Sequence, residues 1–144
     1  MCDEVRAAVA WCHREKRRRR ERLSLEFYSS LPPACRAANA MVREGDAAVC
    51  TSIIVASELR YGCARKGSAK LRKKVEDLLA EIPVLQLDVP VDAEYGALRA
   101  ELGAVGHSDL YIAAHACVLG ATLVTANMGE FTRLRKLKVE NWLE

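Results

Sequence analysis

The sequence has no apolar run long enough to cross a bilayer, and its first residues lack the apolar core of a secretory signal peptide. It also lacks any closely spaced pair of cysteines, since the six stand at positions 2, 12, 35, 50, 63 and 117. These absences argue against a membrane protein, a secreted protein and a cysteine-based metal site. We therefore expect a cytoplasmic protein whose cysteines are reduced thiols, several of them buried as small apolar residues.

Charge is unevenly distributed along the 144 residues, a length that suits a single domain. Residues 31–144 hold fourteen basic and fourteen acidic side chains, so the net charge of +3 comes from residues 1–30. Seven basic groups lie at positions 14–22, and a nucleic-acid-binding protein that works through this run is one hypothesis. A solvated, self-repelling segment is the favoured interpretation, because no aromatic residue is interleaved for base stacking.

The stretch 108–127 is typical of a helix, a turn and a strand. Ser108 is a candidate N-cap, Asp109 suits the first turn of a helix, and Gly120 suits a left-handed helix end. Residues 121–125 form a short apolar run typical of a buried parallel strand, so Asn127 follows the carboxyl end of that strand. Ligands bind at this edge of open α/β sheets. The alternative is that Asp109 only caps a helix and that Asn127 is only a turn residue.

Glu58 lies in a second helical stretch, 52–62, where it shares a predicted face with Ile54 and Tyr61. A carboxylate on an apolar face needs compensation, because burying an unpaired ion costs several kcal/mol. A metal ion is one such compensation.

Four segments in order, from about Gly45 to Glu144, resemble the PIN-domain toxins of the VapC type. They are AVCTSIIVASELRYG (48–62), VLQLD (84–88), DLYIAAHA (109–116) and LVTANMGEF (123–131) followed by LKVENW (137–142). The resemblance implies an α/β, PIN-like three-layer fold with a parallel sheet flanked by helices. It also implies an Mg²⁺-dependent endoribonuclease, with Mn²⁺ as a substitute ion, that hydrolyses RNA such as tRNA. The implied partners are a cognate antitoxin protein and a second copy of the chain.

The same resemblance assigns the site residues. Glu58 and Asp109 would be metal ligands, directly or through water. Asn127 occupies a position often held by aspartate or asparagine, and Thr125 would hydrogen-bond the nucleophilic water or a ligand. Glu130 lies nearby in the sequence and suits a surface position equally well. Hard cations such as Mg²⁺ take oxygen ligands, activate water and offset charge on phosphate.

The N-terminal segment departs from the family, whose first strand ends in Asp-Thr-Asn and supplies the first carboxylate of the metal site. No such strand occurs here, and 23–28, which alternates apolar and polar residues, is the candidate replacement, with Glu26 on its polar phase. We predict an atypical, basic and helical segment over 1–40 and a PIN-like domain over 41–144, with the first strand missing or replaced. A shifted reading frame upstream of Val42 would produce such a start, and translation of the other frames tests this idea. The alternative function is a catalytically inactive PIN protein that retains only partner binding.

The loop before Asp109 is the second departure, because it is about four residues shorter than in the family. The short loop either displaces Asp109 or is absorbed by unwinding of the preceding helix. His107 in this loop is a proton-shuttle candidate, although a lone loop histidine is more often incidental, and His115 is expected to be structural.

The remaining pattern predicts helices over 34–44, 68–81 and 90–105 and strands over 46–51 and 84–87. In the 68–81 helix the apolar residues fall on one face, and the lysines fall on the other, solvated face. The order β-α-α-β-α-α-β then favours a parallel sheet flanked by helices.

Overall fold

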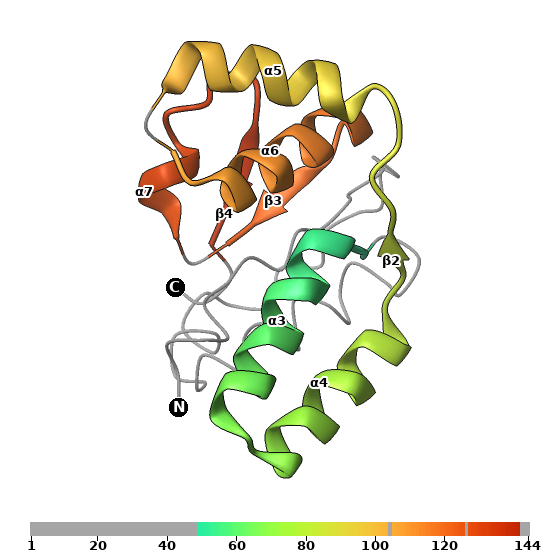
Figure 1. Cartoon of the computed structure of the whole chain (residues 1–144). Coiled ribbons are helices and arrows are strands. Elements are labelled where there is room, and N and C mark those ends of the chain that lie inside the picture. The colour runs from blue at the N-terminus through green and yellow to red at the C-terminus, as the bar shows by residue number, and fades with distance from the viewer. Residues whose placement is uncertain (1–48, 104, 126, 142–144) are drawn as a thin grey trace, which may run out of the picture.

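A computed structural model describes residues 49–103, 105–125 and 127–141 (Figure 1). The helices are α3 (Ile53–Lys66), α4 (Ala69–Glu81), α5 (Val91–Leu102), α6 (His107–Leu119) and α7 (Met128–Phe131), and the strands are β1 (Thr51–Ser52), β2 (Val84–Leu85), β3 (Thr122–Val124) and β4 (Lys138–Glu140). The predicted helix at 34–44, the segment 1–40 and the replacement strand at 23–28 lie outside the described residues. Of the elements present, α7 and β4 were absent from the predicted order.

The strands form two parallel pairs, which confirms the predicted parallel α/β organisation. In one pair Thr51 is in register with Val84, and in the other Leu123 is in register with Val139. No ladder joins the two pairs within the described ranges. Apolar packing brings them together instead, because Val49, Ile82 and Val124 form one buried cluster.

Helix ends follow local sequence signals at most of the predicted positions. The hydroxyls of Ser52 and Ser68, the residues at which the predicted helical stretches 52–62 and 68–81 begin, accept hydrogen bonds from the first turns of α3 and α4. Gly120 ends α6 at φ +62°, the left-handed conformation expected of it. The prediction of Ser108 as an N-cap is wrong, because the N-cap is Gly106, two residues earlier, and α6 already begins at His107.

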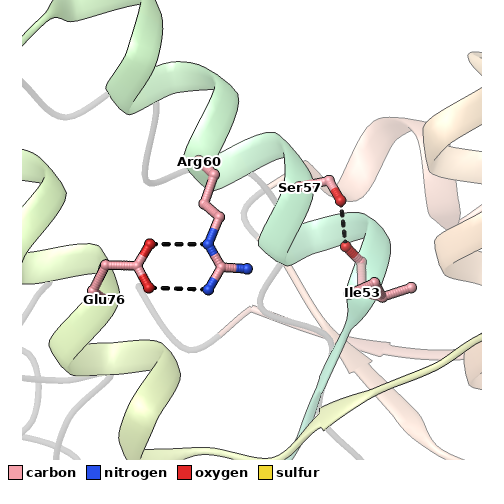
Figure 2. Close-up of polar contacts among 4 residues, drawn as sticks. All are labelled: Ile53, Ser57, Arg60 and Glu76. Carbon is pink, nitrogen blue, oxygen red and sulfur yellow. Dashed lines mark hydrogen bonds and ion pairs between the residues drawn. The ribbon is translucent and has the colours of Figure 1, made fainter.

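Helices α3 and α4 form a hairpin at one end of the molecule (Figure 1). Its buried contact consists of Ala56, Cys63, Val75 and Leu79, so the predicted apolar face of α4 is confirmed. On the exposed side, Arg60 Nε and Nη2 donate to the two carboxylate oxygens of Glu76 at 2.9 and 3.0 Å (Figure 2). Exposed ion pairs contribute little to stability, so burial of the apolar face holds the hairpin closed.

The main core lies between α5, α6 and β3, where fully buried side chains include Leu98, Leu110, Leu123 and Phe131. Helix α5 ends at Leu102, three residues before the predicted end, and Gly103 follows at φ +60°. This earlier end agrees with the second of the two alternatives left open by the sequence, in which the preceding helix absorbs the short loop before Asp109. Within the described ranges, no helix is long and apolar enough to span a membrane.

Candidate active site

Glu58 and Ser108 bring helices α3 and α6 into polar contact. Ser108 lies in the first turn of α6, and its Oγ donates a hydrogen bond of 2.9 Å to Glu58 Oε1. Glu58 is exposed, and Tyr61 on the same side of α3 is 61% exposed. The expected burial of Glu58 on an apolar face is therefore wrong. Its carboxylate is compensated by a hydroxyl and by solvent, and it remains accessible to a ligand.

A second polar contact between the same helices lies deeper, where His115 Nδ1 and Ser52 Oγ are 3.0 Å apart. Ser52 Oγ also accepts the Ile54 N–H, and its hydroxyl either donates to Nδ1 or accepts from it, depending on the imidazole tautomer. Both contacts exist only if α3 and α6 run antiparallel, with Ser52 opposite His115 and Glu58 opposite Ser108. The predicted structural role of His115 is borne out by this contact.

His115 is buried, and burial lowers the pKa of its imidazole below the ordinary value. The nearby Asp88 carboxylate acts in the opposite direction and is the smaller influence. Because this lowered pKa lies below physiological pH, the ring is held neutral there.

Asp109 follows Ser108 in the first turn of α6, where a carboxylate interacts favourably with the helix dipole. It is half-buried, and its Oδ2 would lie 3.8 Å from a methyl group placed on Gly106. The carboxylate therefore folds back over the start of the helix. Because Ser108 contacts Glu58 directly, the two carboxylates predicted as metal ligands extend from adjoining parts of α3 and α6.

Thr125 and Asn127 form a separate pair beyond the carboxyl end of β3. Thr125 is 3% exposed, and its backbone N–H donates to the Glu140 carbonyl at 3.0 Å, which extends the β3–β4 ladder. Its Oγ1 accepts the Asn127 N–H at 3.0 Å, while the Asn127 side chain is exposed. Thr125 thus fixes the turn from which Asn127 projects, at the sheet edge predicted for it.

The side chains at the contact of α3 with α6 suit a divalent cation by their chemistry. Glu58, Ser108 and Asp109 offer only oxygen donors, which suit a hard ion such as Mg²⁺. No group of three His, Cys, Asp or Glu side chains with metal-binding geometry occurs within the described ranges. Two carboxylates still suit Mg²⁺, because that ion keeps several waters and is commonly held by one or two carboxylates.

His107 is not placed as a shuttle beside Asp109. Its Nδ1 lies 2.7 Å from the Tyr95 hydroxyl, across the α5–α6 contact. Sequence reasoning missed both this contact and the Ser108–Glu58 bond. Neither had a local signal, because each joins residues that only the packing of helices brings together.

A model of the PIN domain matches residues 12–137, which is most of the chain. The chain belongs to the PIN domain family. Ribonuclease VapC2 of Rickettsia felis is 36% identical over 99 residues, covering 65% of this chain and 74% of the relative. The tRNA(fMet)-specific endonuclease VapC of Salmonella typhimurium is 37% identical over 100 residues, covering 65% and 75%. The resemblance to the VapC branch of the PIN domain family is thereby confirmed.

Solved VapC structures share this PIN fold. The VapBC2 structure from Rickettsia felis, bound to a DNA fragment from its promoter, has a TM-score of 0.61 at 37% identity, covering 65% of this chain and 74% of that chain. The DNA-bound VapBC structure from Salmonella typhimurium has a TM-score of 0.66 at 28% identity, covering 82% and 91%. The PIN match begins at residue 12, inside the basic segment, whereas the domain boundary near residue 40 stays a prediction.

Proposed function

We propose that this PIN domain protein is the toxin of a type II toxin–antitoxin pair and acts as a metal-dependent endoribonuclease. The observation that carries the proposal is the Ser108–Glu58 hydrogen bond of 2.9 Å. It brings the acidic first turn of α6 against the acidic second turn of α3, in a chain whose relatives are named ribonucleases. An exposed carboxylate beside a half-buried one has little use in stabilising the fold, but it suits a divalent cation.

PIN-domain nucleases of the VapC type depend in general on a divalent metal ion, and we propose Mg²⁺ here, with Mn²⁺ as a substitute. Glu58 and Asp109 would hold the ion, which when bound activates water and offsets the charge developing on the scissile phosphate. Ser108 keeps one oxygen of Glu58 oriented. Thr125 and Asn127 contribute a hydroxyl and an amide at the carboxyl edge of the sheet, where they would orient water or substrate.

The proposed substrate is RNA, with tRNA as the first candidate, because one relative is named for cleavage of tRNA(fMet). The proposed partner is a cognate antitoxin, since the similar solved structures are complexes of VapC with VapB. A homodimer and action in the cytoplasm complete the proposal. A catalytically inactive protein that only binds its antitoxin is the alternative, and the following experiment separates the two.

The decisive experiment is cleavage of total tRNA by the purified protein in Mg²⁺, in Mn²⁺ and in EDTA. Glu58→Gln and Asp109→Asn remove the proposed ligands while keeping side-chain size, and each should reduce cleavage by at least about 100-fold. Glu81→Gln is the matched control, because Glu81 is an exposed glutamate at the end of α4. Cleavage that persists in EDTA, or folded parent protein that never cleaves, would contradict the proposal.

A further inference from the structure

A cluster of aromatic and cationic side chains adjoins the proposed active site where α5 packs on α6. The Tyr95 hydroxyl lies 2.7 Å from His107 Nδ1 and accepts a hydrogen bond of 3.1 Å from Arg99 Nη1. The Tyr95 ring stacks on Tyr111, with centroids 4.0 Å apart and planes at 14°. We call Tyr95, Arg99, His107 and Tyr111 the Tyr95 cluster. Stacking on Tyr111 holds the face of the Tyr95 ring, and the contacts with Arg99 and His107 hold its hydroxyl.

The hydrogen-bond directions in the Tyr95 cluster follow from its donors. A guanidinium only donates, so the Tyr95 oxygen is the acceptor from Arg99. The phenol hydrogen is then available to His107 Nδ1, which accepts it in the tautomer that carries the imidazole proton on Nε2. The cluster therefore offers a ligand the remaining N–H groups of Arg99, and in this tautomer His107 adds its Nε2–H as a second kind of donor.

The position of these donors connects them to the site. His107 directly precedes Ser108, whose hydroxyl contacts Glu58, and Arg99 is exposed on α5. Within the described ranges no carboxylate forms an ion pair with Arg99. The Arg99 guanidinium is thus held in place and still has N–H groups that can donate. Such a group, next to a site for phosphodiester chemistry, suits an anion that only accepts hydrogen bonds.

We propose that Arg99 and His107, held by Tyr95, bind the phosphate of the RNA nucleotide next to the scissile phosphodiester. This inference rests on the proposed function. Glu58 and Asp109 are both negative, so they cannot attract the polyanionic substrate by themselves. Fixed donors on the α5 side would hold the strand while the cleaved phosphate lies at the carboxylates.

The test compares Arg99→Gln and Tyr95→Phe with the parent and with Lys70→Gln, which removes an exposed cation from α4. KM and kcat for RNA cleavage are measured for each variant. The affinity for the same RNA is measured separately in the Glu58→Gln protein, first alone and then combined with each of these substitutions. Arg99→Gln should raise KM about 5- to 20-fold with kcat within twofold, and it should reduce the slope of log affinity against log [NaCl] by roughly 0.7. Tyr95→Phe keeps the stacking but releases both donors, so it should raise KM by a smaller factor.

The outcomes distinguish this inference from the proposed function. Weaker RNA binding in Arg99→Gln, with no cleavage by the folded parent, would support the phosphate contact and contradict the nuclease proposal. Unchanged KM and RNA affinity would overturn the phosphate contact even if cleavage is normal. A lower melting temperature, or weaker binding of the antitoxin, with RNA affinity unchanged would overturn it as well, since the cluster would then be an internal tether or a protein contact.

Discussion

Ser108 Oγ donates to Glu58 Oε1 across the contact of α3 with α6, at 2.9 Å. This bond restrains the one candidate metal ligand that is exposed, and it does so through a residue adjacent to the other ligand, Asp109. A carboxylate whose orientation is set by a neighbouring hydroxyl is better preorganised for an ion than a freely rotating one.

Replacing Ser108 by alanine should therefore affect activity more than stability. We expect kcat to fall roughly tenfold, as for other groups that orient a metal ligand, and unfolding free energy to fall by about 1 kcal/mol or less. Ser57→Ala is a close control, because Ser57 donates at 2.8 Å to the Ile53 carbonyl of its own helix (Figure 2). Steady-state kinetics on RNA check the prediction, and equal losses in the two variants would contradict it.

His115 should make the fold less stable in acid. Burial lowers its pKa in the folded protein, so between that value and the ordinary value near 6.5 the unfolded chain binds more protons. The stabilisation is complete above about pH 6.5 and is lost as the pH falls toward the folded-state pKa. Urea unfolding at pH 5, 6 and 7.5 measures this slope.

The matched variant is His115→Asn, which keeps a polar atom near the position of Nδ1 and does not titrate. Its stability should be lower at neutral pH, because a buried ring is lost, but should depend less on pH between 5 and 7. A variant with the same pH slope as the parent would show that other groups cause the acid sensitivity.

The α3–α4 hairpin should depend on packing rather than on its ion pair. Hydrogen bonding with Glu76 raises the pKa of Arg60, and the reciprocal bond lowers the pKa of Glu76, yet both side chains are about half exposed. Solvent and salt screen such a pair. Leu79 is 8% exposed within the hairpin core, and Leu79→Ala should cost about 2 to 5 kcal/mol.

Thermal unfolding of Arg60→Ala and Leu79→Ala checks this prediction. The melting temperature should fall far more in Leu79→Ala, and the small loss in Arg60→Ala should shrink further in 1 M NaCl. A larger loss in Arg60→Ala would mean that the bidentate geometry outweighs solvent screening.

How far the sequence predicted the structure depends on whether the signal was local. Ser52, Ser68 and Gly120 end or begin helices as predicted, because a cap is decided by the residue and its next few neighbours. Ser108 had the same local signal, but α6 starts at His107, and the Ser108 hydroxyl contacts a residue 50 positions away. The candidate residues were found through the family resemblance, whereas the contacts that orient them come from the packing of α3 on α6.

The α5–α6 loop illustrates the same limit. The sequence showed that the loop before Asp109 is shorter than in the family. It left open whether Asp109 is displaced or the preceding helix unwinds. The structure ends α5 at Leu102 and turns through Gly103 at φ +60°, a conformation that glycine adopts without strain. Asp109 consequently keeps its place in the first turn of α6.

Tyr61 should contribute to RNA binding through its exposed ring. It lies three residues after Glu58, so the two side chains are neighbours on the surface of α3, and it is 61% exposed. Stacking of a base on an aromatic ring stabilises single-stranded RNA binding by about 1 to 3 kcal/mol. Tyr61→Ala should therefore raise KM about 5- to 100-fold, whereas Tyr61→Phe, which keeps the ring, should stay within about threefold of the parent.

Leu119→Ala is the control for this prediction, because it removes an apolar side chain that is 40% exposed at the far end of α6 and should leave KM unchanged. Equal effects of Tyr61→Ala and Leu119→Ala would indicate that exposed apolar area, and not stacking beside Glu58, determines RNA affinity.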